Sequence, residues 1–183
     1  GRRDGGHLAK ARGIPADVQA WAGVCYDRRE VAYLPSYVGG AITSWESWQA
    51  QPDGSTRAMQ MAQGVKGLGL IGYQRAPSRI VLCESGIDAL SYATDDSPDD
   101  RARTCYVTVG GRTSEIADAE LARFAAQHGG ARVIIATDAD EAGDRMAEHF
   151  REIIDQARGA QGGGVERDRP EGIEVRDRRG RLK

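Results

Sequence analysis

Two aspartates one residue apart, Asp138 and Asp140, directly follow the apolar run Val133–Ala136. Two carboxylates about 4 Å apart repel each other by about 4 kcal/mol at an effective dielectric of 20. A bound divalent cation would offset this repulsion. The alternative is that Asp140 only caps the next helix and that Asp138 is a solvated loop residue.

A second acidic pair ends another apolar run. Glu84 follows Arg79–Cys83, and Asp88 comes one helical turn later. Because ligands of a parallel sheet collect at the C-terminal ends of its strands, we expect all four acidic residues to converge on one edge. Carboxylate oxygens are the preferred ligands of Mg²⁺, and a pair of such ions can hold a phosphoryl group. The sequence therefore predicts a Mg²⁺ site, with Mn²⁺ as a substitute.

Strands and helices alternate from Ser78 onward, and these elements must position the acidic residues. The predicted strands are Arg79–Cys83, Thr104–Val109 and Val133–Thr137, with Glu171–Arg176 as a fourth. Helices are expected from Gly86, after Thr113 or Ser114, and after a cap at Asp140. This alternation predicts an α/β fold, a parallel sheet with helices on both faces.

The residues before this region follow another pattern. A short helix is expected at Pro15–Ala22, followed by short alternating segments that predict a small antiparallel N-terminal subdomain over residues 1–77. Residues 78–183 form the second predicted domain, with a flexible loop over 158–170 around a three-glycine run. The chain starts without Met, so we expect a fragment cut from a longer protein. We also expect its C-terminus to be truncated, for a reason given with the family's acidic motifs below.

Composition restricts the function only weakly. The net charge of -2 does not indicate a nucleic-acid binder, so such binding would need a local basic face. The three cysteines are isolated, so we expect no zinc and a reducing, cytoplasmic location. No apolar run approaches the length of a membrane span, so we expect no membrane partner.

Two motifs carry a family resemblance. The segment from Glu84 to Leu90, ESGIDAL, and the segment Asp138–Gly143, DADEAG, together resemble the TOPRIM domain, a Rossmann-like fold. Bacterial-type DNA primases, topoisomerases and certain nucleases share this domain. The resemblance covers about residues 78–157. It implies a catalytic Mg²⁺ site at Glu84, Asp138 and Asp140, with Asp88 in support and Glu84 as general base or ligand.

The segment from Lys66 to Ala76 is similar to the one that precedes TOPRIM in bacterial and phage primases, and the opening resembles primase-like proteins of plasmids and other mobile elements. The resemblance implies RNA primer synthesis on a single-stranded DNA template from nucleoside triphosphates. The chain would belong to a larger replication or mobilisation protein, with a helicase or relaxase as a further partner. Lys66, Arg57 and Arg112 would contact phosphate or template, unless they are only exposed solubilising residues.

Two other functions stay open. The same ions could activate water in a TOPRIM nuclease, or the chain could be a non-catalytic DNA-binding module of a relaxase or replication protein. The family's third acidic motif is not evident, and we expect it beyond Lys183 unless Asp177 replaces it.

Overall fold

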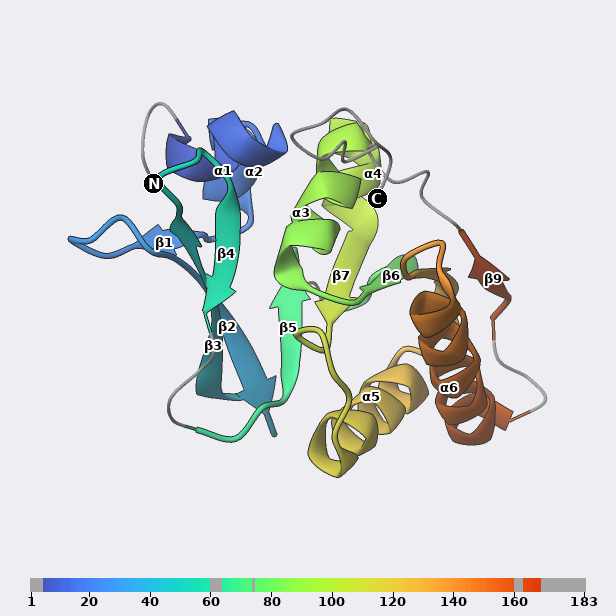
Figure 1. Cartoon of the computed structure of the whole chain (residues 1–183). Coiled ribbons are helices and arrows are strands. Elements are labelled where there is room, and N and C mark those ends of the chain that lie inside the picture. Colours follow the sequence, from blue (N-terminus) through green and yellow to red (C-terminus); the bar gives the residue numbers. More distant parts are fainter. Residues whose placement is uncertain (1–4, 60–63, 74, 160–162, 169–183) are drawn as a thin grey trace.

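The computed structural model describes residues 5–59, 64–73, 75–159 and 163–168 (Figure 1). Within these ranges one mixed sheet runs in the order β4-β3-β2-β5-β7-β6-β8-β9, and β1 pairs with β2 at its side. Its strands are β1 Cys25–Tyr26, β2 Ala32–Val38, β3 Ala41–Ala50, β4 Thr56–Met59, β5 Leu68–Ile71, β6 Arg79–Cys83, β7 Thr104–Thr108, β8 Arg132–Ala136 and β9 Val165–Arg167.

The parallel part of the sheet is β7-β6-β8-β9, and β6 lies at its centre. Cys83, the last residue of β6, is level with Thr108 of β7 and Ala136 of β8. The three strands therefore end at one edge, as the sequence predicts. Strands covered on both faces read as continuous apolar runs, which explains the composition of β6, β7 and β8.

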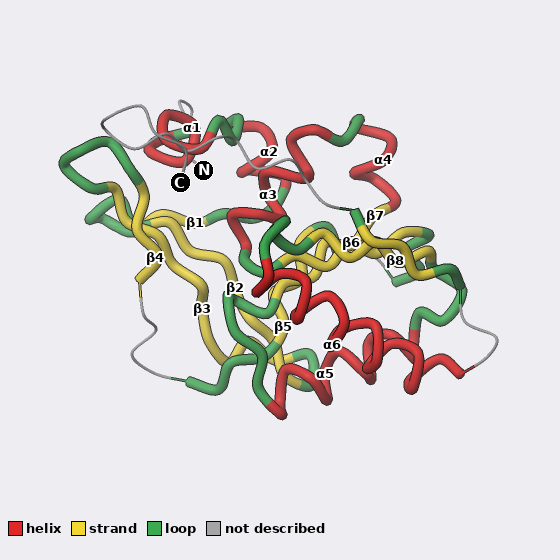
Figure 2. Tube along the Cα trace, turned by 45° about the vertical axis from the view of Figure 1, so that its right-hand side comes forward, coloured by secondary structure: helices red, strands yellow, loops and turns green. Residues whose placement is uncertain are grey.

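Helices cover both faces of the sheet, which confirms the predicted α/β fold. In Figure 2, α1, α2 and α3 lie on one side of the strands and α5 and α6 on the other. Alternate residues of β6 serve the two cores: Val81 and Cys83 pack on the α3 side, and Ile80 and Leu82 on the α5–α6 side. The helices are α1 Gly6–Arg12, α2 Ala16–Trp21, α3 Gly86–Asp95, α4 Pro98–Arg103, α5 Glu115–Gln127 and α6 Glu141–Arg158.

The N-terminal strands are antiparallel, as predicted, but they extend the same sheet. β2 pairs with β3 and with β5, and β5 pairs in turn with β7. Leu34 of β2 and Trp48 of β3 belong to the same buried cluster as Val81 and Ile134. The regions on the two sides of residue 77 thus share one sheet and one core.

The segment after α6 differs from the expectation. Val165–Arg167 forms β9, which pairs in parallel with β8, so the flexible loop predicted over 158–170 is wrong for these residues. Val165 and Arg167 have a partner strand in β8, which local composition could not reveal. The predicted strand Glu171–Arg176 and Asp177 lie outside the described residues. No described helix combines the length and apolar character needed to span a bilayer.

Candidate metal site and phosphate pocket

The two acidic segments meet at one edge of the sheet. Glu84 follows β6, Asp138 follows β8, and the backbone N–H of Asp138 donates to Glu84 Oε1 at 3.0 Å. Partial burial raises the pKa of Glu84; the hydrogen bond from Asp138 opposes this, and the charges of Asp138, Asp88 and Asp140 raise it further. Glu84 thus lies in an excess of negative charge, as the sequence predicts.

Asp140 and Gly143 fix the turn into α6. Asp140 is the N-cap of this helix, and its Oδ1 accepts from the N–H of Gly143 at 2.8 Å. A Cβ on Gly143 would stand 2.1 Å from the carbonyl oxygen of Asp138, so only glycine fits there. Asp140 therefore caps α6, and Asp138 is exposed in the loop before it.

Asp88 lies in the first turn of α3 and forms a capping box with Ser85. Its Oδ2 accepts from Ser85 N at 3.0 Å and from Ser85 Oγ at 2.7 Å. Burial is the main cause that raises the pKa of Asp88; the bonds from Ser85 oppose it, the charge of Asp138 adds to it, and Arg12 lowers the pKa. The pKa of Asp88 is thus affected both by Asp138 of the acidic edge and by the nearby Arg12.

The acidic edge fits a hydrated Mg²⁺ in chemistry and charge. Among the described residues no three His, Cys, Asp or Glu side chains lie close enough together to form a metal-holding group. Mg²⁺ nevertheless keeps several waters and needs only one or two protein carboxylates. Glu84 and Asp88 are both destabilised as anions by acidic neighbours, and a cation would relieve this repulsion. Their assignment as ligands, with Asp138 and Asp140, remains a prediction.

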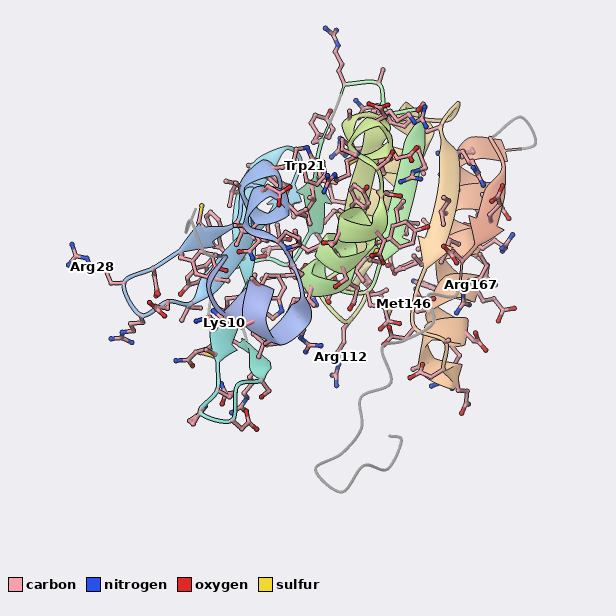
Figure 3. The ribbon with its side chains drawn as sticks, turned by 90° about the horizontal axis from the view of Figure 1, so that it is seen from above. Lys10, Trp21, Arg28, Arg112, Met146 and Arg167 are labelled. Carbon is pink, nitrogen blue, oxygen red and sulfur yellow. The ribbon has the colours of Figure 1, made fainter. Side chains whose placement is uncertain are left out.

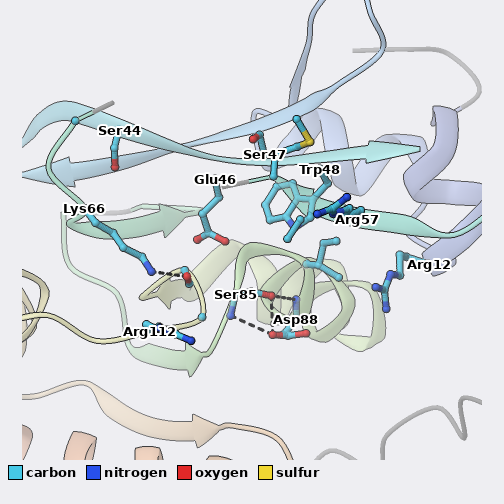
Figure 4. Close-up of a pocket in the computed structure, with 16 residues that line it drawn as sticks. Arg12, Ser44, Glu46, Ser47, Trp48, Arg57, Lys66, Ser85, Asp88 and Arg112 are labelled. Atoms are coloured by element: carbon cyan, nitrogen blue, oxygen red, sulfur yellow. Dashed lines mark hydrogen bonds between the residues drawn. The ribbon is translucent and has the colours of Figure 1, made fainter. Parts of the chain in front are cut away.

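A pocket of about 770 Å³ opens beside this edge, between β3, β4 and the turns after β6 and β7 (Figure 4). Its lining includes four of the predicted site residues, namely Arg57, Lys66, Asp88 and Arg112. Glu84, Asp138 and Asp140 are not among its lining residues. The pocket and the acidic edge are therefore adjacent compartments, joined through Ser85 and Asp88 of the turn into α3.

Basic side chains surround this pocket. Lys66 is partly buried and donates from Nζ to the carbonyl oxygen of Gly110. Burial lowers the pKa of Lys66, Glu46 opposes this effect, and Arg112 adds to it. Arg57 is exposed at the pocket, and the exposed Arg112 projects outward from the loop after β7 (Figure 3). The structure thus brings all three predicted cations to one pocket.

Among the lining residues that sequence reasoning did not assign to a site are Arg12, Ser44 and Glu46. Arg12, at the end of α1, donates from Nε to Thr56 Oγ1 at 3.3 Å. Glu46 accepts from Gly86 N at 2.8 Å and from Thr108 Oγ1 at 2.5 Å. Burial raises the pKa of Glu46, while the bonds from Thr108 and Gly86 and the charge of Lys66 lower it. The one available signal was an acidic residue between two tryptophans in the strand-like run of β3.

Comparison with known proteins supports the class that the fold and the acidic edge define. A family model described as Toprim-like matches residues 81–163, the range that contains both acidic motifs. No curated protein matches the chain. The match supports a TOPRIM domain in this part of the chain. Such a domain implies metal-dependent action on nucleic acid, and TOPRIM domains generally bind Mg²⁺.

Proposed function

We propose that the chain performs primase-type RNA primer synthesis on single-stranded DNA, within a larger replication or mobilisation protein of a plasmid or other mobile element. One observation carries this proposal. The paired acidic segments at Glu84 and Asp138 share an edge with a large pocket that holds four basic side chains. A metal-dependent transfer between nucleotides on a template needs both compartments.

The residues divide by role. Glu84, Asp138 and Asp140 would hold Mg²⁺, which when bound neutralises charge on the reacting phosphate. The alternative role of Glu84 is that of general base: its pKa is raised by burial and by its acidic neighbours, which suits it to take the proton from the attacking hydroxyl if it is not a metal ligand. Lys66, Arg57 and Arg112 would bind phosphate groups of nucleotide or template.

Primer synthesis can be tested directly with single-stranded DNA, ribonucleoside triphosphates and Mg²⁺, using the longest soluble form of the protein. Asp138→Asn should lower the rate by about 100-fold or more, because it removes a charged ligand. Asp155→Asn, which changes an exposed residue of α6, is the matched control and should keep the wild-type rate. Loss of the activity in both variants, or in neither, would contradict the assigned role of Asp138.

The same assay separates the alternatives. Mg²⁺-dependent cleavage of DNA without nucleotides would identify a nuclease, and DNA binding without either reaction would identify a binding module. The basic pocket has its own test: Lys66→Met should weaken nucleotide binding, whereas Lys10→Met should not. Lys10 is exposed on α1 and is not among the residues that line the pocket.

A further inference from the structure

Glu46 occupies a space that glycines keep open. A Cβ on Gly110 would stand 3.4 Å from Glu46 Cδ and 2.7 Å from Lys66 Cε. A Cβ on Gly69 would stand 3.4 Å from Glu46 Oε1 and only 2.3 Å from Thr108 Oγ1. The backbone around this carboxylate is therefore shaped to admit it together with its two hydrogen-bond donors.

The carboxylate of Glu46 lies where an anion would otherwise bind. Gly86, whose N–H donates to Glu46 Oε2, is the first residue of the ten-residue helix α3. The N-terminus of a helix favours negative charge because its N–H groups are unpaired and the helix dipole is positive there. Lys66 lies next to Glu46. A Cβ added to Gly110 would stand 3.3 Å from Lys66 Nζ and 3.4 Å from Glu46 Cδ.

Ser44 supplies an independent sign of a ligand at this end of the pocket. The residue is only 3% exposed and lines the same pocket (Figure 4). Within the described part of the structure its hydroxyl has no hydrogen-bond partner. A buried hydroxyl without a partner is costly, and a ligand oxygen would satisfy it.

We propose that Ser44, Glu46 and Lys66 form a subsite for a phosphate group, and that Glu46 determines its selectivity by opposing bare anions. Lys66 and Ser44 donate to the phosphate, and the Glu46 carboxylate already occupies the helix N-terminus. The subsite therefore disfavours free phosphate unless other positive charge accompanies it. The inference rests on the proposed function for the ligand class, a nucleotide or nucleic acid.

The test is pyrophosphate binding to the whole protein, measured by titration calorimetry without divalent metal at mildly alkaline pH. Glu46→Gln keeps an oxygen for Gly86 N, and its amide can donate to Thr108 Oγ1, so it removes only the charge. We expect pyrophosphate to bind about tenfold more tightly, because a like charge next to the subsite is lost. Ser44→Ala or Lys66→Met, added to this variant, should abolish the gain. Glu152→Gln, on the exposed face of α6, is the matched control and should bind like wild type.

Unchanged or weaker pyrophosphate binding by Glu46→Gln would overturn the proposal. If Glu46→Gln binds pyrophosphate and a metal-free nucleoside triphosphate more tightly than wild type, but not a single-stranded oligonucleotide, the subsite is assigned to terminal phosphates. An equal gain for the oligonucleotide assigns it to backbone phosphates. If Glu46→Gln does not fold, Ser44→Ala alone decides: a clear loss of pyrophosphate binding supports the subsite, and wild-type binding overturns it. If Glu46→Gln binds pyrophosphate more tightly but the wild-type protein makes no primer in the synthesis assay, the proposed function is refuted and the subsite is still supported.

Discussion

Gly143→Ala should move the loop that carries Asp138. Gly143 is the third residue of α6, and a Cβ there would stand 2.1 Å from Asp138 O, 2.8 Å from Asp138 C and 2.9 Å from Asp138 N. All three atoms belong to the backbone, so no side-chain rotation can relieve the overlap. The loop must shift by about 1 Å to restore ordinary contact, and this shift would weaken the hydrogen bond from Asp138 N to Glu84.

The size of the effect follows from two opposing contributions. Forced overlap in a packed site costs about 1–3 kcal/mol. Replacing glycine by alanine in a helix returns at most about 1 kcal/mol. We therefore expect a net loss of about 1–2 kcal/mol, which lowers the melting temperature by about 2–8 °C for a chain of this size.

Thermal unfolding followed by circular dichroism measures this loss, and a Mn²⁺ titration measures the effect on the acidic edge. Gly130→Ala is the matched control, because its added Cβ would meet no atom within 4 Å. It should melt at the wild-type temperature or slightly above it. Wild-type stability and wild-type Mn²⁺ affinity in Gly143→Ala would refute the steric explanation of the glycine in the segment Asp138–Gly143.

Three further changes test charge and capping. Glu84→Gln should stabilise the metal-free protein by less than about 1 kcal/mol near neutral pH, because it removes a charge that the folded state disfavours. The folded-state pKa of Glu84 is raised above 4.5, so this gain in stability should vanish as the pH falls below 4.5. Arg158→Met should cost about 2–4 kcal/mol in urea unfolding, since Arg158 donates to three backbone carbonyls, one in the last turn of α5 and two just after its end. Arg145→Met, which breaks an exposed pair, should cost less than about 0.5 kcal/mol. Burial lowers the folded-state pKa of His128 below 6.5, so wild type should lose stability as the pH falls from 6.5 toward that pKa, and His128→Gln should remove this loss; an unchanged pH profile in the variant would contradict it.

The parallel core of the fold could be predicted because its signals are local. β6, β7 and β8 are continuous apolar runs, and Ser114 and Asp140 cap the helices α5 and α6 at the expected positions. β9 could not be predicted, because Val165–Arg167 is identified as a strand only by its pairing with β8. For the same reason the junction of β5 with β7, which joins the N-terminal strands to the parallel sheet, was not visible in the sequence.

The candidate site divides in the same way. Glu84 and the Asp138 segment were predictable as neighbours because each follows a strand of one parallel sheet. The role of Asp88 in a capping box with Ser85 follows from their spacing, but its proximity to Arg12 depends on how α1 packs. Glu46 had only a weak signal, its place between two tryptophans, because its partners Gly86 and Thr108 are far away in the sequence.

The proposed function requires the acidic edge to bind a divalent ion between the ends of β6 and β8. A crystal of the protein soaked in Mn²⁺, with data collected at a wavelength where manganese scatters anomalously, tests it most directly. We predict an anomalous peak within coordination distance of the carboxylates of Glu84 and Asp138. A well-ordered crystal with no peak at these side chains, or with manganese bound only elsewhere, would contradict the account.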